Sequence, residues 1–202
     1  NENILKSNEQ RLKDLRKNIQ IIFQDPYSSL NPRKKVFHSI AEPLLVHNIT
    51  NRKEVSKKVL DILKDVGLNE DFLDKYPHEM SGGQRQRVAI GRALAMKPKL
   101  LVADEPVSSL DVSIQAQIIN LFNEIKKRTM ISMIFISHDL NVVRYISDRI
   151  MVMYKGKILE IGTNENVFFR PLHPYTRMLI SAAQGKFHRI IEEKVEFPDP
   201  VS

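Results

Sequence analysis

Apolar and polar positions alternate with different periods along this chain, and the changes predict a series of strands and helices. Residues 19–23 are rich in β-branched side chains and predict a short strand. The runs 100–103 and 130–136 are almost continuously apolar over strand length, which is typical of parallel strands covered on both faces. Between these runs, one face of a helix is marked by Ile114, Ile118, Leu121 and Ile125. Strands that alternate with helices indicate an α/β fold with a mostly parallel sheet flanked by helices.

A second group of helices is predicted between residues 36 and 95. Apolar residues recur at helical spacing before Gly67, and this glycine can end the helix in a left-handed conformation. A further helix is expected after Ser81. The segment is polar elsewhere, so it predicts a small helical lobe. Residues 150–161, in which Gly156 separates two apolar runs, predict a hairpin.

The composition limits the class of protein. With 202 residues and 42% hydrophobic side chains, the chain can form one domain with a real core. The absence of cysteine excludes a disulfide scaffold, a cysteine nucleophile and a cysteine-ligated metal. No apolar run of the sequence approaches the ~20 residues of a membrane-spanning helix. Residues 184–202 mix charges with prolines, and we interpret them as a tail after a domain that covers residues 1–183.

The net charge of +7 has two interpretations. A basic protein can bind nucleic acid, or it can face an anionic membrane surface. The basic residues of this chain are scattered, and few aromatic residues lie among them, whereas nucleic-acid grooves interleave the two kinds. The sequence therefore favours a protein that has no nucleic-acid partner.

Two adjacent acids, Asp104 and Glu105, follow the apolar run at 100–103. Ligands of open parallel sheets bind at the carboxyl ends of the strands, and successive strand residues point opposite ways. Asp104 is predicted to hold Mg²⁺, directly or through water, because this ion prefers oxygen ligands. Glu105 is predicted to orient or deprotonate the water that attacks a γ-phosphate. A solvated acidic turn at the end of a strand would have the same sequence.

The segment Ser81-Gly82-Gly83-Gln84 predicts a site for an anion. Its S-x-x-Q spacing is that of a capping box, so a helix begins here with free N–H groups and the positive end of its dipole. Gly82 and Gly83 let a phosphate approach the backbone closely. An ordinary capped helix is the alternative. The double glycine directly after the cap, followed by Gln-Arg-Gln-Arg, favours the anion site.

Two single residues complete the set of candidates. His138 follows the apolar run at 130–136, so it is expected at the same sheet edge as the two acids, where it can hydrogen-bond a γ-phosphate or a water. Gln24 follows the first predicted strand, and its amide can contact Mg²⁺ or the attacking water. Each residue by itself is also what an ordinary strand end contains. The order and spacing of all the segments together are specific.

These segments resemble the ATPase subunits of ABC transporters. The resemblance rests on the signature motif (Ser81, Gly82, Gly83, Gln84), the Walker B strand (residues 100–105), the D-loop (Ser109, Leu110, Asp111), the switch histidine (His138) and the Q-loop glutamine (Gln24). It implies a partial nucleotide-binding domain of the P-loop NTPase class, with residues 36–95 as the helical subdomain that carries the signature motif.

Three further segments resemble the importers of oligopeptides and dipeptides. They are residues 23–33, 104–113 and 171–176. The chain departs from that group at Ser109, where alanine is usual, and it has no cysteine cluster of the kind that some members carry near the C-terminus. Nickel importers share much of the same pattern, so the sequence leaves open whether the substrate is an oligopeptide, a dipeptide or nickel.

The resemblance also implies cofactors and partners. In this family two ATPase subunits pair head to tail, and ATP on the Walker A loop of one is closed over by the signature motif of the other. ATP and Mg²⁺ are therefore expected, together with a second ABC ATPase subunit, identical or different. The loop after Gln24 would meet one of two transmembrane permease subunits, which receive substrate from an extracytoplasmic solute-binding protein. The chain would lie at the cytoplasmic face of the inner membrane as a peripheral subunit.

One motif of the family is missing from the sequence. None of the seven glycines belongs to a G-x-x-x-x-G-K-[ST] loop, which the family places before the Q-loop. We expect that the sequence is truncated before Gln24 and that the chain as given is inactive alone. The alternative is a non-catalytic subunit that donates its signature motif to the ATP of a partner. A DNA- or ribosome-associated ABC ATPase is a third hypothesis, and the importer-like segments 25–33 and 173–176 argue against it.

Overall fold

The computed structural model describes residues 8–183, and the chain divides after Ile136 into two compact units. The first unit contains, in chain order, α1 (Glu9–Asn18), β1 (Ile19–Ile22), α2 (Pro26–Ser29), α3 (Val36–Val46), α4 (Val55–Asp65), the 3₁₀ turns η2 (Glu70–Phe72) and η3 (Pro77–Glu79), α5 (Gly82–Leu94), β2 (Leu100–Asp104), α6 (Val112–Thr129) and β3 (Ser132–Ile136). The second contains α7 (Leu140–Ile146), β4 (Arg149–Tyr154), β5 (Lys157–Thr163), α8 (Asn164–Phe169) and α9 (Pro174–Ala183).

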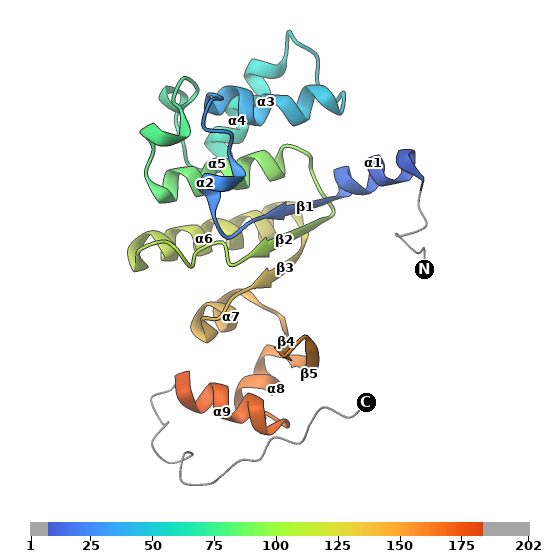
Figure 1. The fold of residues 1–202 in the computed structure, drawn as a ribbon, viewed down its shortest axis with the longest axis vertical. Helices are drawn as coiled ribbons and strands as arrows, with labels where there is room; N and C mark the ends of the chain where they lie inside the picture. The colour runs from blue at the N-terminus through green and yellow to red at the C-terminus, as the bar shows by residue number, and fades with distance from the viewer. Residues whose placement is uncertain (1–7, 184–202) are drawn as a thin grey trace. The chain divides into compact units, whose positions relative to one another are not determined.

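The sheet of the first unit has three parallel strands in the order β1-β2-β3 (Figure 1). Strand β2 lies in the middle, and its last residue, Asp104, is in register with Ile136 at the end of β3. The carboxyl ends of all three strands therefore point the same way. This arrangement confirms the α/β fold with a parallel sheet and helices, and it brings Gln24 and Glu105, which follow β1 and β2, to one edge.

The two faces of this sheet differ in burial. On one face Ile22 and Ala103 are buried, and Phe122 of α6 packs edge-on against Phe135, with ring centroids 5.6 Å apart. On the other face Ile134 is 50% exposed. The prediction that residues 130–136 form a strand covered on both faces is therefore wrong within residues 8–183. The continuous apolar run is typical of a strand with both faces covered, but the helices in the described residues cover only one face of β3.

The helical lobe predicted between residues 36 and 95 contains α3, α4 and α5, which pack on one another (Figure 1). Gly67 has a φ of +71° and ends α4 as expected. Its N–H donates to the carbonyl of Lys64, while the N–H of Leu68 donates to that of Leu63, which is the Schellman pattern. The helices exist as predicted. The division into a domain of residues 1–183 and a tail stays a prediction, since residues 184–202 lie outside the described part.

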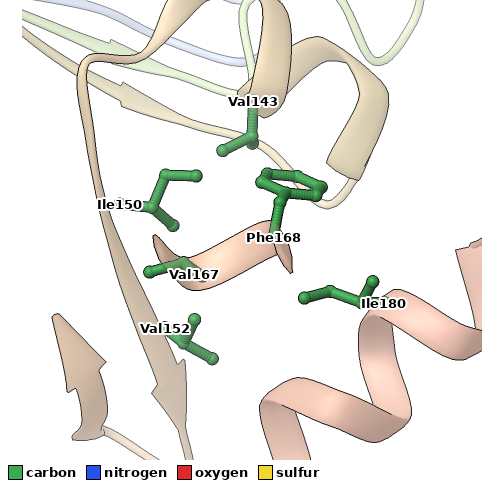
Figure 2. Packing of buried hydrophobic residues seen from close by; sticks show 6 residues of the cluster. All are labelled: Val143, Ile150, Val152, Val167, Phe168 and Ile180. Carbon is green, nitrogen blue, oxygen red and sulfur yellow. The ribbon is translucent and has the colours of Figure 1, made fainter. Parts of the chain in front are cut away.

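The second unit is built on the predicted hairpin. Strands β4 and β5 are antiparallel, and the turn residues Lys155 and Gly156 both have positive φ, as a two-residue turn of type I′ requires. Helices α7, α8 and α9 pack around the hairpin. Figure 2 shows the cluster of buried side chains that joins them: Val143, Ile150, Val152, Val167, Phe168 and Ile180. Within residues 8–183, none of the helices has both the length and the apolar character needed to cross a membrane.

A carboxylate fastens the importer-like segment 171–176 to this hairpin. Glu160 of β5 accepts hydrogen bonds from the backbone N–H of Leu172 and from that of His173, both at 3.0 Å. The Nδ1 atom of His173 in turn accepts from the N–H of Tyr175 at 3.1 Å, inside the first turn of α9. Side-chain acceptors therefore bind backbone N–H groups both before and after Pro174, which holds the start of α9 in place.

These contacts predict a dependence of stability on pH. Partial burial is the largest single influence on the pKa of Glu160 and raises it, but the hydrogen bonds that the carboxylate accepts, among them those from the N–H groups of Leu172 and His173, outweigh it and leave the pKa below its ordinary value of 4.5. Because the folded pKa is lowered, the stabilisation is present above the pKa of the unfolded chain. It is lost as the pH falls through the lowered folded value.

We expect Glu160→Gln to lower the free energy of unfolding at pH 7 by about 1 kcal/mol, since one amide group cannot accept both N–H bonds. Urea unfolding of both proteins from pH 7 downward measures this difference, which should shrink once the wild-type carboxyl is protonated. Glu165→Gln is the matched control, because Glu165 is an exposed acid on α8 of the same unit. A difference that stays constant at all pH values would contradict the role given to the carboxylate.

Candidate functional site

A polar cluster lies where strands β1 and β2 end. The Nε2 atom of Gln24 donates to Oε2 of Glu105 at 3.1 Å, and it lies 3.4 Å from the Oγ atom of Ser108. The Ser108 hydroxyl itself donates to the backbone carbonyl of Glu105 at 3.0 Å. Residues that are 81 positions apart in the sequence are thus joined by one side-chain hydrogen bond.

The backbone of Glu105 is held in an unusual conformation. Its φ of +44° falls in the left-handed region, which residues other than glycine rarely adopt. This conformation costs on the order of 1–3 kcal/mol. The N–H of Glu105 donates to the carbonyl of Ile136 at 3.0 Å, so the end of β3 stabilises this turn. Such local strain is typical of functional sites. Here it turns the chain sharply between Asp104 in the strand and the carboxylate that contacts Gln24.

The oxygen donors at this edge match a hard cation. Asp104 is exposed, and since the carboxylate of Glu105 engages Nε2 of Gln24, the amide oxygen of Gln24 is the atom that remains for an ion. Among residues 8–183, no group of three or more acids or histidines could hold a metal by itself. Magnesium is commonly bound by one or two protein oxygens, with phosphates and waters completing the shell.

The predicted anion site has the expected local structure. The Oγ atom of Ser81 accepts from the N–H of Gln84 at 3.3 Å, and the Oε1 atom of Gln84 accepts from the N–H of Ser81 at 2.9 Å. This reciprocal pair is the capping box that the S-x-x-Q spacing predicts. Helix geometry leaves the N–H groups of Gly82 and Gly83 without a partner inside α5. They are therefore the donors that an anion at this helix end would meet.

The D-loop residues lead directly into α6. Asp111 is the N-cap of this helix, and its Oδ1 atom accepts from the N–H of Ile114 at 3.0 Å and from the hydroxyl of Ser113 at 2.7 Å. The N–H of Ile114 and the Ser113 hydroxyl lower the pKa of the Asp111 carboxyl. Ser109 and Leu110 precede the cap, so the loop is anchored at its C-terminal end by the helix that it begins.

The structure brings the signature and D-loop segments together. A Cβ atom on Gly83 would lie 2.4 Å from Cγ2 of Ile114, and one on Gly82 would lie 3.2 Å from Cδ2 of Leu110. Motifs in the sequence indicate both segments, but none indicates a functional role for Ser108 or Ile114. Ser108 stands inside the acidic segment, yet no pattern at that position indicates a contact with Gln24. Ile114 looks like an ordinary core position of a helix.

The loop after Gln24 is tied to the signature helix. Arg92 of α5 donates from Nη1 to the carbonyl of Ser29 at 2.7 Å, and the guanidinium of Arg85 lies 5.5 Å from the centre of the Tyr27 ring. Beside this loop is an open hollow of about 630 Å³, whose lining includes Arg33 and Arg92. Residues 25–34 therefore form a fixed surface rather than a free loop.

His138 belongs to the second unit. It is exposed, and it immediately precedes Asp139, the N-cap of α7. The Oδ1 atom of Asp139 accepts from the N–H groups of Asn141 and Val142, and the N–H of Asp139 donates to the hydroxyl of Ser137. The backbone around His138 is thus fixed by a turn and a helix cap.

Comparison with known proteins accounts for this set of segments. A sequence profile described as "ABC transporter" matches residues 1–108, which is more than half of the chain. The chain belongs to the ABC transporter family. The matched part contains Gln24, the signature segment and the acids Asp104 and Glu105 at the end of β2.

Curated ABC relatives extend the similarity through the second unit. The chain is 53% identical over 203 residues to the oligopeptide transport ATP-binding protein AppF of Bacillus subtilis, covering 97% of this chain and 61% of AppF. It is 48% identical over 191 residues to the dipeptide transport ATP-binding protein DppF of Haemophilus influenzae, covering 93% and 58%. It is 59% identical over 171 residues to the glutathione import ATP-binding protein GsiA of Pectobacterium atrosepticum, covering 85% and 27%. The chain thus spans less than two thirds of the length of these relatives.

Solved structures agree with the fold. CbiO1 of Clostridium perfringens, part of the ABC transporter complex cbiONQ, aligns with a TM-score of 0.72 at 29% identity, covering 92% of this chain and 72% of its own. The ATP-binding cassette MJ0796, in a dimeric post-hydrolysis state bound to ADP and Pi, aligns with a TM-score of 0.68 at 29% identity, covering 79% and 68%. This ABC chain therefore has the fold of nucleotide-binding domains.

Proposed function

We propose that this chain is the ATP-binding and ATP-hydrolysing part of an ABC importer of oligopeptides or dipeptides, active within an assembled transporter. The observation that carries the proposal is the hydrogen bond from Gln24 to Glu105 at 3.1 Å. It joins the residue before the fixed loop 25–34 to the acid best suited to act on the attacking water. A single contact thus connects hydrolysis with a surface that can sense a partner.

Glu105 is the general base in this proposal. Its carboxylate would orient or deprotonate the water that attacks the γ-phosphate, and Gln24 would hold that carboxylate in place through Nε2. His138 would donate a hydrogen bond to the γ-phosphate or to the water. The strained backbone at Glu105 supports this assignment, because it fixes the direction of the carboxylate before ATP arrives.

Asp104 and the amide oxygen of Gln24 would hold Mg²⁺, directly or through water. The ion would neutralise charge that develops on the phosphates during hydrolysis. These two residues supply only part of a coordination shell, which fits an ion that is shared with the nucleotide.

A second ABC ATPase subunit would complete the site. The N–H groups of Gly82 and Gly83, at the positive end of α5, are suited to a γ-phosphate held by that partner subunit. Ser81 is exposed at the same helix end, so its hydroxyl is accessible to the same phosphate. Leu110 of the D-loop lies against this segment, and the D-loop residues Ser109, Leu110 and Asp111 would share the dimer interface.

Two transmembrane permease subunits are the further partners. The hollow beside residues 25–34 is a suitable seat for a helical segment of a permease, since the loop is fixed to α5 by Arg92. ATP-driven closure of the ATPase pair would then move the permeases between two states. The chain would lie at the cytoplasmic face of the inner membrane, an extracytoplasmic solute-binding protein would deliver the substrate, and nucleic acid has no role.

The names of the relatives support a peptide substrate. Their transport substrates are oligopeptides, dipeptides and glutathione, which share a peptide backbone. The test is uptake by the complex isolated from its native membrane and reconstituted into lipid vesicles with its solute-binding protein. We expect ATP-dependent uptake of a labelled peptide that unlabelled peptide competes away and Ni²⁺ does not. Uptake of Ni²⁺ in place of the peptide would mean that the substrate is nickel. Uptake that does not depend on ATP would contradict the proposed ATPase role.

A further inference from the structure

The two glycines of the signature segment are not required by the backbone. Neither Gly82 nor Gly83 has a positive φ, in contrast to Gly67 and Gly156. Both stand in the first turn of α5, where alanine is the better helix former. The reason for glycine at these positions must therefore be space around the missing side chain.

At Gly83 that space is filled from within the same chain. Gly83 is buried, and a Cβ atom there would meet Cγ2 of Ile114 at 2.4 Å, a distance that real Cβ atoms do not show. The neighbouring atoms are also of the Ile114 side chain, with Cβ at 3.7 Å and Cδ1 at 3.9 Å. The side of Gly83 that lacks a side chain therefore faces α6, and only its N–H is left for a phosphate.

Ile114 is itself fixed to the D-loop. Its N–H donates at 3.0 Å to the carboxylate of Asp111, the D-loop residue that directly follows Leu110 and caps α6. A second tie between the same helices lies further along, where Nη2 of Arg87 donates to Oε1 of Gln117 at 3.3 Å. One isoleucine thus contacts the signature segment through its side chain and the D-loop through its backbone.

We propose that Ile114 is a positioning residue, which seats against Gly83 so that the signature and D-loop segments of this subunit reach the partner subunit's nucleotide as one body. The inference rests on the proposed function, in which both segments face that nucleotide. It gives Gly83 a second reason to be glycine, because any side chain there would push the anion-binding end of α5 away from α6.

The proposal predicts a rescue. Gly83→Ala in the assembled transporter is expected to lower kcat for ATP hydrolysis on the order of 100-fold. Relieving the clash requires α5 or α6 to shift, and a displacement of about 1 Å at a site has an effect of that order. The KM for ATP should change little, since the signature segment contributes mainly after ATP is bound. Adding Ile114→Ala removes the clashing methyl group. The double variant should then have a kcat within about tenfold of that of the Ile114→Ala protein. Such a rescue is the non-additivity expected of two residues in contact.

Two matched variants sharpen the test. Ile114→Val retains a methyl group at the clashing position, so Gly83→Ala with Ile114→Val should keep the low kcat of Gly83→Ala. Ile118→Ala removes the same atoms from a buried position one turn along α6 and should not rescue either. If Gly83→Ala prevents assembly, Ile114→Ala must restore assembly, and thermal unfolding of the complex reports this directly.

The possible results distinguish failure of the positioning role of Ile114 from failure of the proposed function. If Gly83 is glycine only because a phosphate needs the room, Ile114→Ala will not rescue Gly83→Ala, and the positioning role is overturned. Equal rescue by Ile118→Ala would overturn it as well, because the effect would then be general loosening of α6. A wild-type complex without ATP hydrolysis would instead reject the proposed function and leave the steric coupling to be read from assembly alone.

Discussion

Replacing Glu105 with glutamine is expected to lower the rate of ATP hydrolysis by about 10²- to 10⁴-fold in the assembled transporter, while ATP still binds. The amide keeps the shape of the side chain and can still accept the hydrogen bond from Gln24 through its oxygen. It cannot take a proton from the attacking water. Release of phosphate in a single turnover measures the chemical step, and a fluorescent ATP analogue measures binding.

Glu124→Gln is the control for this experiment. Glu124 is an exposed acid on α6 of the same unit, so the change in charge is identical and turnover should stay at the wild-type value. Hydrolysis by Glu105→Gln at the wild-type rate would show that another group is the base. If, in addition, transport survives Glu105→Gln but fails when Ser81 is replaced by tryptophan, the chain serves only as the donor of a signature motif to its partner.

Phe122→Ala is expected to lower the free energy of unfolding by about 3–5 kcal/mol, the usual cost of removing a fully buried phenylalanine. Phe122 is 0% exposed, and its ring meets Phe135 of β3 edge-on at 5.6 Å. This pair holds α6 on the sheet, and α6 carries the D-loop at its N-terminus. The loss should appear as a lower midpoint in urea unfolding of the complete chain.

Phe23→Ala provides the comparison. It removes the same atoms from the same unit, but Phe23 is 56% exposed, so the expected loss is below about 1 kcal/mol. Equal midpoints for Phe122→Ala and wild type would mean that the contact between α6 and β3 contributes nothing to the stability of the fold. A loss from Phe23→Ala as large as that from Phe122→Ala would mean that Phe23 is covered in solution.

Local signals in the sequence were sufficient for several elements. The S-x-x-Q spacing predicted the capping box at Ser81, and it forms because both partners lie within one helical turn. Gly67 and Gly156 predicted a helix end and a turn, because positive φ is a property of the residue and its immediate neighbours. The continuous apolar run at 100–103 predicted the central strand β2.

Burial of the third strand could not be predicted in the same way. The run 130–136 predicts a strand covered on both faces, whereas Ile134 and Ile136 are 50% and 45% exposed in the described part of the chain. An apolar run shows what a strand can bury. It contains no information on which helix supplies the cover, since that depends on distant segments.

Residue types and their spacing predict three of the segments proposed to form the site: an acidic pair at the end of a buried strand, a capped double-glycine helix and a loop that follows a glutamine. These are local properties, set by residue type and by spacing within a few turns. The contacts between these segments are visible only in the folded chain. Gln24 meets Glu105 because β1 and β2 are neighbours in the sheet, and Gly83 meets Ile114 because α5 packs on α6. Such pairs arise from chain topology and steric fit, which no local pattern of residues specifies.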